Sequence, residues 1–187
     1  AAREGQGMKP LLVDYTDPAS IAALIDTVAA RTNERIDALF NNGAYGQPGA
    51  VEDLSVETLR RQFETNVFGW HDLTCRVIPF MRRQGHGRIV HCSSILGLVP
   101  YRYRGAYTAS KFALEGLGVT LRMELEGSGI HVSMIEPGPL ASKRSEERRG
   151  GHARSSRRAP SHSTKNCCYF LHITSRVPLS IVTHPLL

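Results

Sequence analysis

Short apolar runs alternate with longer amphipathic segments along most of the chain, and this alternation constrains the fold more than any other feature. Four runs are predicted as strands, at residues 8–13, 36–40, 88–93 and 130–135. Between them, apolar residues recur at spacings of three and four, which indicates helices packed against a sheet. Strands that alternate with helices over short connections form a parallel sheet. The sequence therefore predicts an α/β fold in which helices cover both faces of a parallel sheet.

The three predicted helices have recognisable ends. The first begins after Asp17, a favourable N-cap that is followed by proline. The second begins after Ser55, and Pro79 is expected to kink or end it before the G-H-G segment at 85–87 closes it. The third spans about residues 106–126 and stops at a second pair of glycines.

Polar and chain-breaking residues follow three of the predicted strands. They are N-N-G at 41–43, S-S at 93–94 and E-P-G-P at 136–139. In a parallel sheet the carboxyl ends of neighbouring strands lie along one edge, where ligands bind. We therefore expect this edge, called the rim below, to carry the functional site.

Four polar side chains near the rim suggest proton-transfer chemistry. Tyr107 and Lys111 are four residues apart on a predicted helix and share one face. A protonated lysine beside a phenol favours phenolate and pulls the tyrosine pKa from about 10 towards neutrality, as an acid/base requires. Ser94 ends the preceding strand, where its hydroxyl can donate to a carbonyl oxygen that becomes an alkoxide. Asn66 lies in the middle of a predicted helix, where asparagine is unfavourable and needs a reason.

The order and spacing of these motifs resemble the short-chain dehydrogenase/reductase family. Each motif alone is weak, and the combination is specific. The resemblance runs over about residues 11–140 and includes the N-N-G turn, Asn66, the strand end G-R-I-V-H-C-S-S, thirteen positions from Ser94 to Tyr107, then Lys111 and the E-P-G-P break.

The resemblance implies both a fold and an activity. Residues 1–140 are expected to form an incomplete, truncated Rossmann-type domain with a doubly wound parallel sheet. The implied activity is that of an oxidoreductase, which interconverts a small-molecule alcohol and a carbonyl with NAD or NADP as cofactor. A homo-oligomer that forms through the helices carrying Asn66 and Tyr107 is also implied.

The catalytic residues implied by the resemblance are Asn66, Ser94, Tyr107 and Lys111. Tyr107 would exchange the proton with the substrate oxygen, and Ser94 would hold that oxygen. Lys111 would bind the nicotinamide ribose hydroxyls and lower the tyrosine pKa. Asn66 would keep a water in the proton relay.

The same resemblance places the cofactor along the strand ends. Asp14 matches the acidic residue that contacts the adenine, the segment 41–44 stabilises the strand next to the cofactor, and the Pro-Gly pair after the last strand lies beside the nicotinamide. The segment 95–99, with Tyr101 and Tyr103, would line the substrate pocket. The full set of expected cofactor-binding residues is Asp14, Tyr15, Asn42, Gly43, Ala44, Tyr107, Lys111, Pro137 and Gly138.

One departure from the family pattern motivates an alternative function. The family's glycine-rich turn, T-G-x-x-x-G-x-G, lays the pyrophosphate on a helix N-terminus and should precede Leu11 by two strands and a helix. The sequence does not contain it. One edge of the 36–40 strand should therefore lie open. The alternative to an active enzyme is an inactive remnant that cannot bind the cofactor.

The last quarter of the chain differs in composition from the rest. Residues 1–140 hold 14 basic and 15 acidic residues, and residues 141–187 hold 9 and 2, so the chain's net charge of +6 comes from this basic tail. Low apolar content over 141–166 predicts disorder. We interpret the abrupt change near Leu140 as a reading-frame change in the gene, and the alternative is a genuine divergent tail. No aromatic residue lies among the arginines of 143–158, so nucleic-acid binding is not expected.

Other sequence signals exclude several classes of protein. There is no run of about 18 apolar residues and no apolar stretch at the start, so we expect a cytoplasmic protein with no membrane partner. Cys75 and Cys92 stand alone in apolar segments, and the adjacent Cys167 and Cys168 are badly spaced for a disulfide or a zinc site. The histidines show no paired metal-binding spacing, and no metal site is expected.

Overall fold

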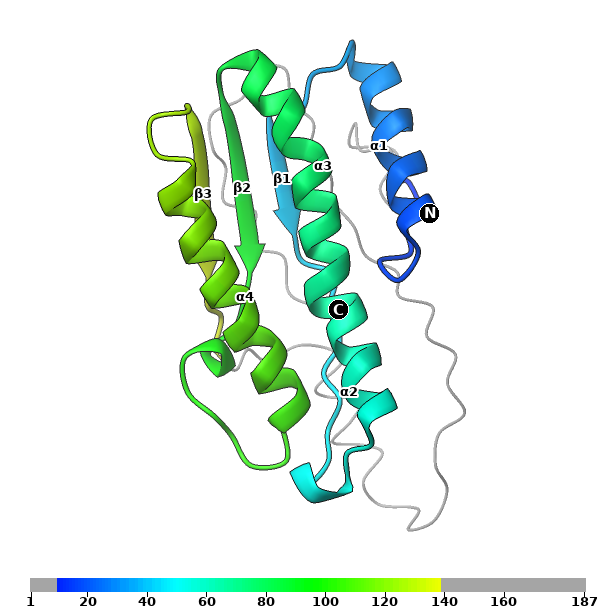
Figure 1. Ribbon diagram of the computed structural model, residues 1–187, viewed down its shortest axis with the longest axis vertical. Coiled ribbons are helices and arrows are strands. Elements are labelled where there is room, and N and C mark those ends of the chain that lie inside the picture. Colours follow the sequence, from blue (N-terminus) through cyan, green and yellow to red (C-terminus); the bar gives the residue numbers. More distant parts are fainter. Residues whose placement is uncertain (1–9, 139–187) are drawn as a thin grey trace.

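The computed structural model describes residues 10–138 as a three-stranded parallel sheet packed against helices (Figure 1). The expected disordered tail lies outside these residues. In chain order the elements are α1 (Pro18–Thr32), β1 (Ala38–Asn41), η2 (Val51–Asp53), α2 (Val56–Phe63), η3 (Glu64–Phe68), α3 (Gly69–Gln84), β2 (Gly87–Cys92), η4 (Ile95–Gly97), α4 (Gly105–Glu124) and β3 (Ile130–Ile135).

The sheet has the order β1-β2-β3, and all pairs are parallel, which confirms the predicted α/β class. The buried residues Leu39, Ile89 and Val132 are paired across it and form one apolar row beneath the helices. The helices that the structure describes all lie on this one face, whereas helices on both faces were predicted (Figure 1). For α3 and α4 the reason is that β1, β2 and β3 are added in one direction, so the two right-handed connections between them cross on the same side.

The predicted strand at 8–13 is wrong for the part that the structure describes. Residues 10–13 pair with no strand there, and the Leu12 side chain is 87% exposed. Val13 and Tyr15 nevertheless reach the buried core beside α1. Within residues 10–138, β1 is hydrogen-bonded to a strand on one side only, which agrees with the predicted open edge.

The helix starts follow the expected capping chemistry. The Asp17 carboxylate accepts a hydrogen bond from the Ala19 N–H at 2.9 Å, and proline occupies the first turn of α1. Ser55 does the same for α2, accepting from the Thr58 N–H at 3.2 Å. The caps therefore fix where the helices begin, as predicted.

The long second helix differs from its prediction in two ways. A π-helical segment, η3, interrupts it around Asn66, and Pro79 does not end α3, which continues to Gln84. Pro79 and Cys75 are both on the exposed face, so the Cys75 carbonyl, which loses its usual helical partner, can be hydrated. Gly85 then closes the helix with a φ of 73°, as predicted.

No helix in the described part of the chain is long and apolar enough to cross a membrane. Within residues 10–138, histidine, cysteine and carboxylate side chains do not gather in a group of three or more that could hold a metal ion.

Candidate active site

The expected site residues meet at the carboxyl ends of the strands. Tyr107 and Lys111 project from the first half of α4, and Ser94 directly follows β2. The Ile95 N–H donates to the Pro137 carbonyl at 3.1 Å, so the loop after β3 is joined to the loop after β2. The rim predicted from the strand ends therefore exists as one continuous edge.

Lys111 is a buried ammonium at this rim, only 1% exposed. Its Nζ donates a hydrogen bond to the Cys92 carbonyl at 2.7 Å and lies 4.5 Å from the centre of the Trp70 ring and 5.6 Å from that of Tyr107. Burial lowers the pKa of Lys111 to about 8, and the negative forms of Cys92 and Glu115 offset part of that lowering. The site thus holds a buried cation that is hydrogen-bonded to a backbone carbonyl and lies close to two aromatic rings.

Tyr107 is half-buried, and burial raises the pKa of its phenol. A hydrogen bond with the Ser94 side chain and the nearby positive charge of Arg104 act in the lowering direction but do not outweigh burial. The predicted shift of this pKa towards neutrality is therefore wrong for the protein alone. The physical reason is the burial of the phenol, which disfavours the charged phenolate.

Ser94 caps the short helix η4 and is held in place by it. Its Oγ accepts from the Leu96 N–H at 3.1 Å, while its side chain also contacts the phenol of Tyr107. Ser93, the residue before it, points instead into the protein, and its Oγ is buried with no hydrogen-bond partner among the described residues. The two adjacent serines are thus distinguished by their surroundings.

The structure gives a reason for an asparagine at position 66, in the middle of a helix. It is fully buried in the π-helical segment, and its carboxamide grips the backbone of Tyr45: Nδ2 donates to the carbonyl at 2.8 Å, and Oδ1 accepts from the N–H at 3.2 Å. Nδ2 also donates to Ser110 Oγ on α4 at 3.2 Å. Asn66 therefore ties the segment after β1 to the helix that carries Tyr107. Its expected role with a water stays a prediction.

Sequence reasoning missed three further residues, Gln62, Trp70 and Thr74, that hydrogen-bond to β1 or to the segment that follows it. Trp70 Nε1 donates to the Gly43 carbonyl at 2.7 Å, and Asn41 Nδ2 donates to Thr74 Oγ1 at 3.0 Å. Gln62 contacts the backbone on both sides of residue 46. With Asn66, these residues form what we call the polar row, which consists of Gln62, Asn66, Trp70 and Thr74. The signal was available: a hydrogen-bonding side chain recurs every fourth position on a face that is otherwise expected to be apolar.

The polar row also fixes the protonation of His91. Thr74 donates its hydroxyl proton to the Trp70 carbonyl at 2.6 Å, so it must accept from the Asn41 amide. The same amide nitrogen contacts His91 Nδ1 at 3.1 Å, which must therefore accept, and the ring is neutral with its proton on Nε2. Burial, and secondarily the charge of Lys111, lowers the pKa of His91 to about 4.

Acid is therefore expected to destabilise the protein through His91. Below pH 6.5 the unfolded chain takes up a proton at this residue, whereas the folded chain does so only near pH 4, so stability falls as the pH falls through this window. Urea unfolding at several pH values should show a loss of about 3 kcal/mol that His91→Gln lacks. Parallel pH profiles for the two proteins would contradict this assignment.

The carboxylate of Asp14, the expected adenine contact, makes its hydrogen bonds within its own turn, and its role toward a cofactor stays a prediction. The Asp14 carboxylate closes its own turn, with Oδ1 accepting from the Thr16 N–H at 2.8 Å and the Thr16 hydroxyl at 2.7 Å. Tyr15 is buried and packs against the start of α3, so closely that a Cβ on Gly69 would contact its backbone oxygen. The remaining expected residues, at 42–44 and 137–138, stay with the rim, and the Gly43 carbonyl is held by Trp70.

The residues at the rim fit the nicotinamide–ribose end of a dinucleotide. The Lys111 ammonium has three N–H donors, and among the described residues it gives one to the Cys92 carbonyl, which leaves two that can meet hydroxyl acceptors beside Tyr107. No glycine-rich strand-to-helix turn for a pyrophosphate occurs within residues 10–138. The described residues therefore fit the reactive end of such a cofactor and do not include a site for its phosphates.

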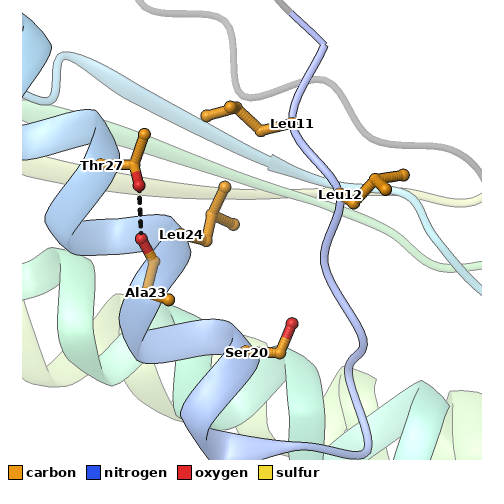
Figure 2. Close-up of a pocket in the computed structure, with 6 residues that line it drawn as sticks. All are labelled: Leu11, Leu12, Ser20, Ala23, Leu24 and Thr27. Atoms are coloured by element: carbon orange, nitrogen blue, oxygen red, sulfur yellow. Dashed lines mark hydrogen bonds between the residues drawn. The ribbon is translucent and has the colours of Figure 1, made fainter.

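Two surface hollows lie elsewhere. One, of about 160 Å³, separates residues Leu11 and Leu12 from α1, where Leu24 and Thr27 face it (Figure 2). The other, of about 210 Å³, lies between Tyr15 and the η3–α3 helix. Asn66, Ser94, Tyr107 and Lys111 line neither of them, so the candidate site rests on convergent chemistry rather than on the size of a hollow.

Comparison with known proteins gives consistent matches over the same region. A family model described as short chain dehydrogenase matches residues 1–152. The chain is 44% identical over 137 residues to the uncharacterized oxidoreductase YbbO of Escherichia coli K12, covering 73% of this chain and 51% of YbbO. It is 35% identical over 131 residues to the 3-ketodihydrosphingosine reductase of Bacteroides thetaiotaomicron, covering 70% and 48%.

Solved structures agree with these sequence matches. A short-chain dehydrogenase from Streptomyces avermitilis superposes with a TM-score of 0.72 at 36% identity, over 76% of this chain and 52% of that one. The chain thus spans about half the length of the curated relatives it matches.

Proposed function

Because the chain belongs to the short-chain dehydrogenase family, we propose that the protein is an oxidoreductase that interconverts an alcohol and a carbonyl with NAD or NADP, with Tyr107 as the acid/base. One observation carries the proposal. A phenol that contacts the Ser94 hydroxyl lies one helical turn from the buried ammonium of Lys111, at the rim of a parallel sheet. This arrangement suits proton exchange with a substrate oxygen.

In the reduction direction, the carbonyl oxygen accepts hydrogen bonds from Ser94 and Tyr107. Reduced nicotinamide, when bound, supplies the hydride that reaches the carbonyl carbon. The oxygen then becomes an alkoxide, and the Tyr107 phenol donates its proton to it. Burial raises the pKa of this phenol, so it is protonated at neutral pH and ready to donate. The resting state of the site therefore suits carbonyl reduction better than alcohol oxidation.

Lys111 acts in two ways in this proposal. Its two remaining N–H donors hold the ribose hydroxyls, which fixes the cofactor beside Tyr107. Its positive charge also stabilises the phenolate that forms when Tyr107 gives up its proton. Trp70, whose ring centre is 4.5 Å from Nζ, keeps the ammonium in place.

We propose a mostly apolar substrate. The segment that follows Ser94 exposes apolar and aromatic side chains, with Leu98 at 55%, Val99 at 49% and Tyr101 at 70%. Such side chains next to a reactive serine favour an apolar alcohol or ketone over a polar one. The relative from Bacteroides thetaiotaomicron is called a 3-ketodihydrosphingosine reductase, so its name gives a keto compound as the substrate. A homo-oligomer through α3 and α4 is also proposed, to be checked by light scattering.

The test is a reaction of the purified protein with NADH or NADPH and matched pairs of ketones that differ in chain length. We expect consumption of the reduced nucleotide that depends on the ketone and is faster for the long apolar member of each pair. Mass spectrometry of the product identifies the alcohol. If circular dichroism shows a folded protein and no pair reacts, the alternative of an inactive remnant replaces this proposal.

A further inference from the structure

Gln62 is a fully buried polar residue one helical turn before Asn66. Its Oε1 accepts from the Gln47 N–H at 2.8 Å, and its Nε2 donates to the Tyr45 carbonyl at 2.8 Å. When both the oxygen and the nitrogen of a buried carboxamide hydrogen-bond to one short loop, they hold that loop in a single conformation. Asn66 grips the same Tyr45 peptide, so the loop is held from two consecutive turns.

The loop fixed by Gln62 forms one wall of the Tyr107 site. Between the two gripped residues lies Gly46, against which the Tyr107 ring packs: a Cβ built on Gly46 would lie 3.4 Å from Tyr107 Cδ2. The same loop continues to Gly49, whose N–H donates to the Tyr103 carbonyl at 3.1 Å and so joins the segment that leads into α4. A shift of the loop would therefore change the packing around the Tyr107 ring.

We propose that Gln62 is a positioning residue for Tyr107, which acts by fixing the peptide groups on either side of Gly46 and so holding the wall against the phenol ring. Tyr107's catalytic role rests on the proposed function, but the positioning itself does not. The side chain of Gln62 hydrogen-bonds to the Gln47 N–H and the Tyr45 carbonyl and not to the phenol of Tyr107, so its effect on that phenol is indirect.

The proposal has a measurable consequence for Tyr107 itself. Burial is the main cause that raises the pKa of this phenol. When the wall loosens, water reaches the ring more easily and the phenolate is better solvated, so the pKa falls towards that of free tyrosine. A purely structural role for Gln62 would lower stability without this specific change.

The chain offers a matched control. Gln84 makes the same kind of contact at the opposite edge of the sheet, where Oε1 accepts from the Ile36 N–H at 2.6 Å and Nε2 donates to the Ile36 carbonyl at 3.0 Å. Gln62→Met and Gln84→Met each remove one such clamp while keeping the shape of the side chain. They differ in whether the clamped segment faces Tyr107, and Gln84 is also less buried than Gln62 and donates in addition to the His86 carbonyl.

The experiment is a pH titration of the whole chain with ¹³C-labelled tyrosine, in which Tyr107 is assigned by its loss in Tyr107→Phe. We expect Gln62→Met to lower the Tyr107 pKa by about 0.5 or more, whereas Gln84→Met leaves it unchanged. Gln62→Asn, which keeps an amide but shortens its reach, should shift it less in the same direction and serves if the methionine variant does not fold. An unchanged pKa in folded Gln62 variants, or an equal shift in Gln84→Met, would overturn the proposal. The titration needs no enzymatic turnover, so this result is independent of whether the proposed activity is found.

Discussion

Tyr107→Phe is expected to lower kcat for carbonyl reduction by about 10²–10⁴-fold, which is the usual contribution of a positioned acid or base. The variant keeps the ring that packs against Gly46 and beside Lys111 and removes only the oxygen that gives up the proton. Substrate binding through the apolar segment after Ser94 should be kept, so KM should change little. Steady-state kinetics with a reactive ketone and saturating reduced nucleotide measure both constants.

The adjacent serines provide the control for this prediction. Ser94→Ala removes a hydroxyl that contacts Tyr107 and should also lower kcat. Ser93→Ala removes a buried hydroxyl that has no partner within residues 10–138, so activity and stability should stay near those of the wild type. Loss of activity in Ser93→Ala but not in Ser94→Ala would contradict the assignment of the site.

Trp70→Ala is expected to lower the free energy of unfolding by about 3–5 kcal/mol, the range for a large aromatic residue removed from a core. The Trp70 side chain is fully buried, donates to the Gly43 carbonyl and stacks on His91 with ring centres 6.0 Å apart. Its ring also lies against the Lys111 ammonium. In Trp70→Ala this buried charge would lose its contact with the ring, which adds to the loss of stability. Urea unfolding at pH 7 gives the difference.

A second substitution separates volume from hydrogen bonding at this position. Trp70→Phe keeps most of the apolar ring and loses the N–H that binds Gly43, so a smaller loss of about 1–3 kcal/mol is expected. If Trp70→Ala were no more destabilising than an exposed substitution such as Val51→Ala, the polar row would not be the support of the rim that the geometry indicates.

Much of the fold could be predicted because its signals are local. Caps at Asp17 and Ser55 and the left-handed stop at Gly85 need only neighbouring backbone groups, and the structure places all of them as expected. The strand at 130–135 was recovered residue for residue. By contrast, residues 10–13 read as a strand from composition, but a strand also needs a hydrogen-bonded neighbour, which local sequence does not reveal.

In the candidate site, too, some features could be predicted from local sequence and others depend on tertiary contacts. The spacing of Tyr107 and Lys111 places them on one helical face, and Ser94 follows from its position at a strand end. The π-helical segment around Asn66 and the grip of Gln62 on the 45–47 loop depend on tertiary contacts. The sign of the Tyr107 pKa shift was missed because it depends mainly on how far the folded chain buries the phenol, which local sequence does not reveal.

The central claim is that the rim formed by Ser94, Tyr107 and Lys111 binds the nicotinamide–ribose end of a cofactor. Nicotinamide mononucleotide carries that end alone, so its binding does not require a site for the second nucleotide. In ¹⁵N-labelled protein, we expect it to shift the backbone amides around Cys92, Tyr107 and Lys111, whereas adenosine monophosphate at the same concentration does not. Lys111→Met, which replaces the buried ammonium by an apolar chain of similar length, should abolish the shifts while circular dichroism shows the fold retained. Equal shifts with both nucleotides, or shifts that persist in Lys111→Met, would contradict the claim.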